Sequence, residues 1–430
     1  MEAGARLGIT AHARYRTVPQ AQIVELLALH GWGHRMRSEG ATARHEASEA
    51  LERFVAAGLP FESAARGERR FDPAEVLNTI KWASIHRGDP LWPDHFVATG
   101  RRLVSEFHAG SDGRRTPPPP ATLGPRRFSV SLEREFNLRA ATKGKAIRLR
   151  MPLPLESAML RGLEIGSARS SIAGAALSSG PGRLDAKLPP SAEETATLGA
   201  ELSFVAEPSG PGIGRSALTQ SELDLYTQPR EGIIQVDARI AALAAELAGT
   251  PHEPWQTVRR FWDFIQTRLI CGVLHVDELD RSNPLHSILD MGWYDCRLGS
   301  ALLVALCRAR GLPARMASGY VLYSISPFYH YWMEIWLGER GWVPLDLFSA
   351  NLTAKESDEA WQDYFLGGLD YRMQTQCLPR LFDTSPALDF PASWYTLTRS
   401  RGDGIEIGVF ETNSGNFIFR DRISVVSAAV

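Results

Sequence analysis

Cys296 stands where a polar loop enters an apolar helical stretch, within the segment WYDCRLGSALLVALCRARGLPAR, residues 293–315. The first N–H groups of a helix have no intrahelical acceptor, and the helix dipole places partial positive charge there. Both effects lower a thiol pKa and favour the thiolate, which is the nucleophilic form of cysteine. The backbone N–H of Cys296 can also bind an oxyanion that forms on an attacked carbonyl. The sequence therefore predicts a cysteine nucleophile at this position.

A base for this thiol is predicted in the segment FYHYWMEIWLGERGWVPLDLFS, residues 328–349. His330 lies on a predicted strand, and a turn at residues 338–341 leads into a second strand that ends near Asp346. An antiparallel hairpin of this length brings Asp346 back beside His330. A carboxylate there fixes the imidazole tautomer and stabilises its charged form, which completes a set of nucleophile, base and orienting acid.

Four further residues are candidates for shaping the site. Trp293 and Tyr294 precede the nucleophile, and Trp332 and Glu334 alternate with His330 on one face of its strand. Each has an ordinary structural interpretation, because aromatic side chains beside a site are more often packing residues. Singly, a cysteine at a helix start or a histidine on a strand is also usually structural. The order and setting of the three residues together favour catalysis.

The compound pattern resembles the transglutaminase-like superfamily of papain-related thiol enzymes. The family motif is a Cys that opens a helix, then R-x-x-G-[IL]-P-A-R, G-Y, H-x-W-x-E and G-W-x-x-x-D. The matching residues are Cys296; Arg308, Gly311, Leu312, Pro313, Ala314 and Arg315; Gly319 and Tyr320; His330, Trp332 and Glu334; Gly341, Trp342 and Asp346. The resemblance covers roughly residues 222–350 and implies a papain-like core with an acyl-enzyme thioester on Cys296.

Two positions depart from the pattern. Many relatives carry Gly before the Cys, where this chain has Asp295, and animal transglutaminases carry Trp after it, where this chain has Arg297. No acidic cluster resembles the calcium sites of the animal enzymes. These departures argue against protein crosslinking and calcium activation, and we expect neither a metal nor another cofactor.

The positioning elements predict an α+β fold in which a helical N-terminal domain and a β module precede the transglutaminase-like core. Apolar residues follow a helical period from residue 20 to 108, without strand-like alternation. Four consecutive prolines then indicate a linker, and the period changes to two from Phe128 onward. Within the last region we expect helices at 234–248, 254–270 and 297–310, strands at 314–323, 330–337 and 341–346, and strand-like segments in the tail, 393–425. The predicted divisions are 1–108 helical, 109–126 linker, 127–230 antiparallel β module and 231–430 catalytic.

The composition is that of an ordinary globular protein. The 430 residues are 44% hydrophobic and 22% charged, and the formal net charge is −2, so no basic surface for nucleic acid is predicted. The sequence shows neither a signal-peptide pattern nor an apolar run long enough to cross a membrane. The four cysteines form no CxxC pair, and Cys307 falls inside an apolar helix, as core cysteines do. We therefore expect a cytoplasmic protein with reduced thiols.

Three functions fit these residues. The first is an acyltransferase that forms an amide from an acyl donor and an amine, including carrier-protein-bound acyl thioesters in polyketide and nonribosomal peptide biosynthesis. The second is a cysteine peptidase or amidase that uses water as the acceptor. The third is a non-catalytic scaffold, which the loss of Cys296, His330 or Asp346 would have indicated. The choice between amine and water depends on the shape and dryness of the site, which the sequence does not reveal.

Overall fold

The computed structural model describes most of the chain between residues 17 and 429. The described ranges are 17–29, 41–87, 91–108, 116–138, 146–157, 159–190, 193–208, 217–250, 253–274, 279–280, 282–324, 327–354, 358–377, 381–382, 385–386, 398–401, 404–407 and 419–429. Of the predicted linker, residues 116–126 are described and include a 3-10 turn (Pro120–Thr122), whereas 109–115 lie outside these ranges.

A four-stranded antiparallel sheet forms the centre of the predicted catalytic region. Its strands are β14 (Ala314–Val321), β15 (Phe328–Trp336), β16 (Trp342–Leu345) and β17 (Arg372–Cys377). They lie in the order β16-β15-β14-β17, and the register of β14 and β15 sets Gly319 opposite His330. A Cβ atom on Gly319 would lie 2.1 Å from the carbonyl oxygen of Met373 on β17, so only glycine allows this approach. The predicted strands at 314–323, 330–337 and 341–346 correspond to the first three.

Helix α10 (Cys296–Ala309) packs on this sheet against β14 and β15. Its residues are buried from Arg297 to Arg308, as expected for a helix that is apolar on nearly all sides. The Asp295 carboxylate caps its N-terminus by accepting the N–H of Leu298 at 2.7 Å. After its last turn the chain continues through Gly311, whose φ of 71° favours glycine. The predicted helix at 297–310 is confirmed, and Cys296 is its first residue.

Shorter elements surround α10. The helices are α6 (Gln220–Thr227), α7 (Ala238–Ala248), α8 (Pro254–Arg268), α9 (Pro284–Met291), α11 (Leu347–Thr353) and α12 (Glu359–Tyr364). The two-residue strands are β10 (Arg230–Glu231), β11 (Ile234–Gln235), β12 (Ile270–Cys271) and β13 (Trp293–Tyr294). The helix expected from residue 234 begins at 238, because residues 234–235 pair as β11 and Asp237 caps α7. The helix expected at 254–270 is α8.

The β module consists of two sheets. The strands from this part of the chain are β4 (Arg126–Asn137), β5 (Ala146–Pro152), β6 (Leu160–Ser170), β7 (Ala176–Gly180), β8 (Arg183–Leu188) and β9 (Thr195–Ala206). From the tail come β20 (Thr398–Arg401), β21 (Gly404–Ile407) and β22 (Phe419–Ala429), while β18 (Leu381–Phe382) pairs with β19 (Ser385–Pro386). The sheet orders are β22-β4-β9-β6 and β20-β21-β5-β8-β7.

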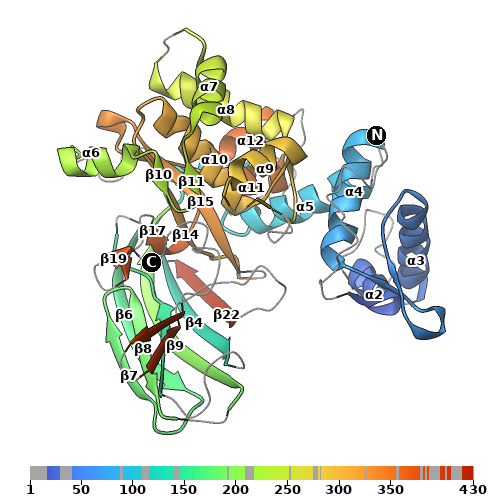
Figure 1. Ribbon diagram of the computed structural model, residues 1–430, viewed down its shortest axis with the longest axis horizontal. Helices are drawn as coiled ribbons and strands as arrows, with labels where there is room; N and C mark the ends of the chain where they lie inside the picture. The colour runs from blue at the N-terminus through green and yellow to red at the C-terminus, as the bar shows by residue number, and fades with distance from the viewer. Residues whose placement is uncertain are drawn as a thin grey trace.

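The tail strands β20 to β22 therefore lie in the sheets of the β module and not in the catalytic sheet (Figure 1). β22 pairs antiparallel along the whole of β4 up to Phe136, and β21 pairs parallel with β5. Sequence reasoning had assigned the tail to the region 231–430, since strand partners that are far apart leave no local pattern. The domain boundaries themselves stay predictions.

The N-terminal region is mainly helical, with α2 (Gln20–Leu29), α3 (Ala41–Ala56), α4 (Pro73–Arg87) and α5 (Leu91–Ser105). It also contains a small sheet in the order β1-β3-β2, which the helical interpretation missed because such short strands show no alternation. These strands are β1 (Val18–Pro19), β2 (Glu62–Ser63) and β3 (Arg69–Phe71). The region has a core of its own around Leu51, Phe54 and Phe71. In Figure 1, α2 and α3 lie to one side of the catalytic helices, and α5 connects toward α11.

Within the described ranges, no helix combines the length and the apolar character that crossing a bilayer requires.

Candidate active site

His330 and Asp346 form a buried pair at the centre of the catalytic sheet. The imidazole Nε2 lies 2.9 Å from each carboxylate oxygen of Asp346, and the side chains are 1% and 0% exposed. Asp346 follows β16 directly and is the N-cap of α11. Because the carboxylate accepts from Nε2, we assign the proton of the neutral imidazole to Nε2. Among the described residues Nδ1 has no hydrogen-bond partner, so its lone pair is available as a base.

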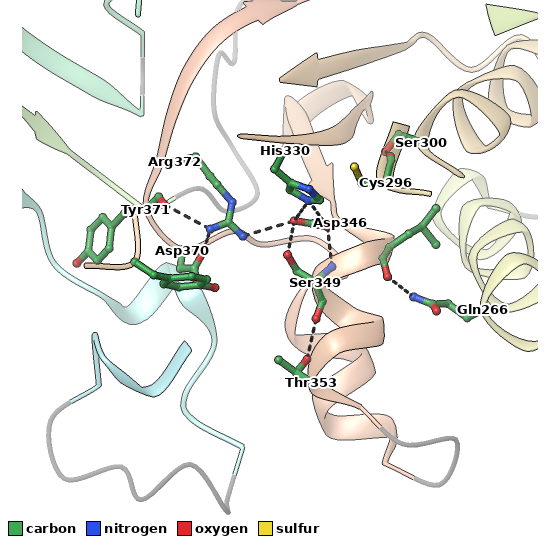
Figure 2. Close-up of polar contacts among 12 residues, drawn as sticks. Gln266, Cys296, Ser300, His330, Asp346, Ser349, Thr353, Asp370, Tyr371 and Arg372 are labelled. Atoms are coloured by element: carbon green, nitrogen blue, oxygen red, sulfur yellow. Dashed lines mark hydrogen bonds and ion pairs between the residues drawn. The ribbon is translucent and has the colours of Figure 1, made fainter. Parts of the chain in front are cut away.

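Cys296 lies on the side of the His330 ring away from Arg372 in the view of Figure 2. It is half-buried, whereas Cys271 and Cys307 are fully buried. The sulfur accepts the backbone N–H of Tyr331, the residue after His330, and α10 packs against β15. The hydroxyl of Ser300 donates to the carbonyl of Cys296 at 2.7 Å and fixes the first helical turn. The three residues predicted as nucleophile, base and orienter thus meet in one place.

The expected fall in the thiol pKa is wrong. Burial, followed by the negative charge of Asp295, raises the pKa of Cys296 well above its ordinary value. The positive charge of Arg297 and the N–H of Tyr331 act in the opposite direction but do not overcome these two effects. The helix N-terminus alone therefore does not produce a thiolate, and the resting site holds a neutral thiol.

The carboxylate of Asp346 is held in its ionised form. Burial acts to raise its pKa, but His330, Arg372 and the N–H of Ser349 outweigh burial and hold the pKa of Asp346 at about 2. The N–H of Ser349 donates to Oδ1 at 2.9 Å, and the Ser349 hydroxyl donates to Oδ2 at 2.7 Å. The guanidinium Nη2 of Arg372 lies 3.4 Å from Oδ2 (Figure 2). Each of these neighbours donates to the carboxylate.

Sequence reasoning missed Ser349 and Arg372. Ser349 follows Asp346 by three residues, and this spacing at a helix start is a capping signal that could have indicated the contact. Arg372 reaches Asp346 because β17 pairs with the far side of β14, with Val321 opposite Arg372. No local pattern in the sequence predicts that pairing.

Trp293 and Tyr294 form β13, directly before Cys296, and both side chains are buried. Trp293 packs into the core of the N-terminal helical region. Tyr294 is fully buried, and its hydroxyl donates to Gln266 at 3.2 Å. A Cβ atom on Gly299 would lie 2.3 Å from the Tyr294 ring, so this ring packs directly on the first turns of α10.

Trp332 and Glu334 lie along β15 beside His330. The Trp332 ring stacks near the imidazole, with 6.4 Å between ring centroids, and its indole N–H points to Glu334 at 3.4 Å. Glu334 pairs with Arg315 on β14 at 2.6 Å, and the Arg315 guanidinium lies 4.0 Å from the Trp342 ring centroid. Trp332 therefore lies beside the His330 ring, while Glu334 links β15 to β14 through Arg315.

No group of three or more His, Cys, Asp or Glu side chains in the described ranges is placed to hold a metal ion.

Comparison with known proteins gives one family and several partly similar structures. The family model described as the transglutaminase-like superfamily matches residues 241–347, a stretch that contains Cys296, His330 and Asp346. The chain is similar to a protein from Cytophaga hutchinsonii assigned as a cysteine protease, with 13% identity, a TM-score of 0.43, and coverage of 71% of this chain and 91% of that chain. It is also similar to the periplasmic domain of TgpA from Pseudomonas aeruginosa, with 16% identity, a TM-score of 0.30, and coverage of 54% and 91%. No curated protein sequence matches the chain. Residues 241–347 form a transglutaminase-like core within a mixed α+β chain.

Proposed function

We propose that the protein is a thiol-dependent acyltransferase that forms an amide bond through an acyl thioester on Cys296. One observation carries the proposal. His330 turns Nε2 to the ionised Asp346 and keeps Nδ1 free of other partners, beside the helix start that bears Cys296. A neutral imidazole held in this tautomer is a base for a nearby thiol.

The first half of the cycle forms the acyl-enzyme. The Cys296 proton passes to Nδ1 of His330 as sulfur attacks the carbonyl carbon of the donor. The developing oxyanion accepts the backbone N–H of Cys296, which as a first-turn N–H has no intrahelical acceptor. The tetrahedral intermediate collapses, the bond to the leaving group breaks, and the imidazolium gives its proton to that group. Because the thiol rests in its neutral form, proton transfer must accompany attack.

The second half transfers the acyl group. An amine attacks the thioester, His330 removes its proton, and the carbon–sulfur bond breaks to release the amide. The proton returns to the Cys296 sulfur, which restores the resting thiol. Asp346 stays ionised throughout and stabilises the transient imidazolium.

The donors that we propose are acyl thioesters, including those on carrier proteins in polyketide and nonribosomal peptide biosynthesis. The chemistry that supports this class is exchange between thioesters, since the leaving thiol and Cys296 are similar leaving groups. We also propose a cytoplasmic location, for which the free thiols of Cys271, Cys296 and Cys307 are the support.

A second candidate, a cysteine peptidase or amidase, uses water in the deacylation step. The residue Cys296 is partly exposed although its thiol is desolvated, and this partial exposure favours access of water to the thioester. The same three residues serve this reaction, so the acceptor alone separates the two functions.

Intact-protein mass spectrometry separates them. Wild-type protein, Cys296→Ala and Cys307→Ala are incubated with the thioester acetyl-N-acetylcysteamine or with a peptide amide, each with and without glycine ethyl ester as the amine. We expect a thioester-derived adduct on wild type and on the Cys307→Ala control, discharged by the amine into an amide. An adduct formed from the peptide amide and discharged by water supports the peptidase. Equal labelling of wild type and Cys296→Ala overturns both, because the nucleophile would then lie elsewhere.

A further inference from the structure

Arg372 is a buried cation placed between two buried carboxylates. Its side chain is 0% exposed, as are those of Asp346 and Asp370. Nη2 lies 3.4 Å from Asp346 Oδ2, and Nη1 forms an ion pair with Asp370. Figure 2 shows the guanidinium between the two acids, on the side of Asp346 that faces away from Cys296.

Arg372 stays charged, and its neighbours stabilise this charge. Burial acts to lower the pKa of Arg372, but Asp370 and the other neighbours outweigh burial and raise the pKa above its ordinary value. The Tyr323 hydroxyl donates to Asp370 at 2.6 Å, which fixes the second carboxylate. The Tyr323 and Phe365 rings lie 5.8 and 5.9 Å from the guanidinium carbon. Burying an ion in this way lowers the stability of the fold by several kcal/mol unless the ion is well paired. We therefore expect a function of this buried charge.

We propose that Arg372 is a positioning residue for the acyl-transfer reaction: its guanidinium fork holds the Asp346 carboxylate against Nε2 of His330, while Asp370 holds the fork. The inference rests on the proposed function, because it assumes that His330 is the base for Cys296. Arg372 touches neither the thiol nor the acyl group.

Other groups that face Asp346 cannot replace this contact. Ser349 donates from the same helix but is neutral. Cys271 and Tyr294 also face Asp346, but burial raises the pKa of Cys271 to about 11 and that of Tyr294 further above its usual range. Neither carries charge at neutral pH. His330 and Arg372 are therefore the groups that stabilise the negative charge of Asp346.

The Arg372 guanidinium contacts Asp346 and Asp370 at the same time, which requires its forked shape. A guanidinium can contact two carboxylates at once, whereas a lysine ammonium at the same position is a point charge on a different stem. Arg372→Lys keeps the charge and loses the simultaneous contact with Asp346 and Asp370. Arg372→Met loses both the charge and the contacts.

The matched control is Arg308, which pairs with Glu231 at 2.6 Å and has side-chain exposures of 0% and 8% for the two partners. It is as deeply buried as Arg372 but lies at the far end of α10 and makes no contact with Asp346. Arg308→Met therefore reports the cost of breaking a buried pair in the same core.

The experiment measures kcat and KM with acetyl-N-acetylcysteamine, thermal unfolding, and the rate of iodoacetamide alkylation of Cys296 from pH 5 to 9 in the full-length protein. For Arg372→Met we expect kcat to fall on the order of tenfold to a hundredfold, as for a displaced catalytic group, with little change in KM. At pH 5, alkylation of Arg372→Met should be about tenfold slower than that of wild type at the same pH, because Asp346 then takes up a proton more readily and supports the imidazolium less. Arg372→Lys should recover part of both losses, and Arg308→Met should lose stability while keeping the wild-type profile.

A wild-type kcat and alkylation profile in folded Arg372→Met overturns the inference, as does an equal change in Arg308→Met. If Arg372→Met does not fold, Arg372→Lys decides: an unshifted profile there has the same meaning. Failure of the proposed function looks different, since Cys296→Ala would then acquire the same thioester adduct as wild type.

Discussion

The two halves of the site are held in different ways. The His330–Asp346 half is buried, and hydrogen bonds from Ser349 and Arg372 fix the carboxylate in its ionised form. The Cys296 half is half-buried, and burial with Asp295 keeps the thiol neutral. In the proposed reaction, the base side is therefore organised before substrate arrives, while the nucleophile side depends on proton transfer during attack.

The two halves also rest on different parts of the chain. On the base side, Tyr320 lies next to Gly319, the residue opposite His330, and its hydroxyl donates to Asp421 on β22. Arg134 on β4 donates to both oxygens of Asp421, at 2.5 and 2.6 Å. On the nucleophile side, Asn78 of α4 binds the loop after β12. The β module thus supports the strand next to His330, and the N-terminal helices support the loop after β12, the strand that pairs with β13 just before Cys296.

The largest effect should come from Asp346→Asn. His330, Ser349 and Arg372 each donate a hydrogen bond to this carboxylate, so the amide nitrogen of Asn must face one of these donors. We expect kcat with the acetyl thioester to fall on the order of a thousandfold. Retention of activity within threefold of wild type would contradict the organised base.

The same variant tests the pH dependence of stability. The pKa of Asp346 is lowered from its ordinary value of 3.8 to about 2, so its stabilising contribution is complete above 3.8 and is lost as the pH falls toward 2. Across this window, the free energy of unfolding measured with urea should fall by on the order of 2 kcal/mol more for wild type than for Asp346→Asn.

Arg134→Met should have the next largest effect, on the support of the base side. Its side chain is 1% exposed, and its removal leaves the largely buried Asp421, which is 13% exposed, without this cation, although the Tyr320 hydroxyl still donates to it. Breaking one partner of a buried pair costs about 3–5 kcal/mol. Urea unfolding measures the loss, and the double variant Arg134→Met/Asp421→Leu should recover most of it because no unpaired charge remains. A double variant as unstable as the single one would argue against an electrostatic cause.

Asn78→Ala should weaken the support of the nucleophile side by about 1–2 kcal/mol. The Asn78 amide donates to the carbonyl of Val273 at 2.8 Å and accepts the N–H of Val273 at 2.9 Å. Hydrogen exchange at the Val273 amide should therefore accelerate. Asn78→Asp keeps the acceptor for that N–H, so it should preserve the protection; equal acceleration in both variants would show that the contact does not hold the loop.

Asp295→Asn should have the smallest effect and the opposite sign. The amide oxygen can still accept the N–H of Leu298, so the cap stays while the negative charge beside Cys296 disappears. The pKa of Cys296 should fall, and iodoacetamide alkylation at pH 7 should accelerate about threefold. Asp295→Ala loses both the charge and the cap, so its comparison with Asp295→Asn, which loses only the charge, separates the two effects. Unchanged or slower alkylation in Asp295→Asn would remove Asp295 as a cause of the neutral thiol.

The placement of the predicted triad followed from local sequence. Strand alternation, the turn at residues 338–341 and the helix start at Cys296 are all encoded within about one turn or hairpin, and tertiary packing did not override them. Arg372 and the partners of β22 could not be predicted in this way. They depend on pairing between segments that are far apart, which one sequence leaves undetermined.

The error in the thiol pKa has a different origin. A helix N-terminus is visible in sequence, and its dipole favours the thiolate. The burial of Cys296 is a property of the folded core, and the Asp295 charge lies close to the sulfur only because Asp295 caps the helix.

The long separation between β4 and β22 has a consequence for the order of events on the ribosome. Asp421 is synthesised 287 residues after Arg134, which takes roughly 15–60 s at ordinary rates of translation. During that interval one edge of β4 has no strand beside it, and Cys296, His330 and Asp346 are all made before the interval ends. A nascent chain thus holds all its reactive groups before Tyr320 can meet Asp421. We expect full reactivity of the thiol to appear only after the strand that carries Asp421 has left the exit tunnel.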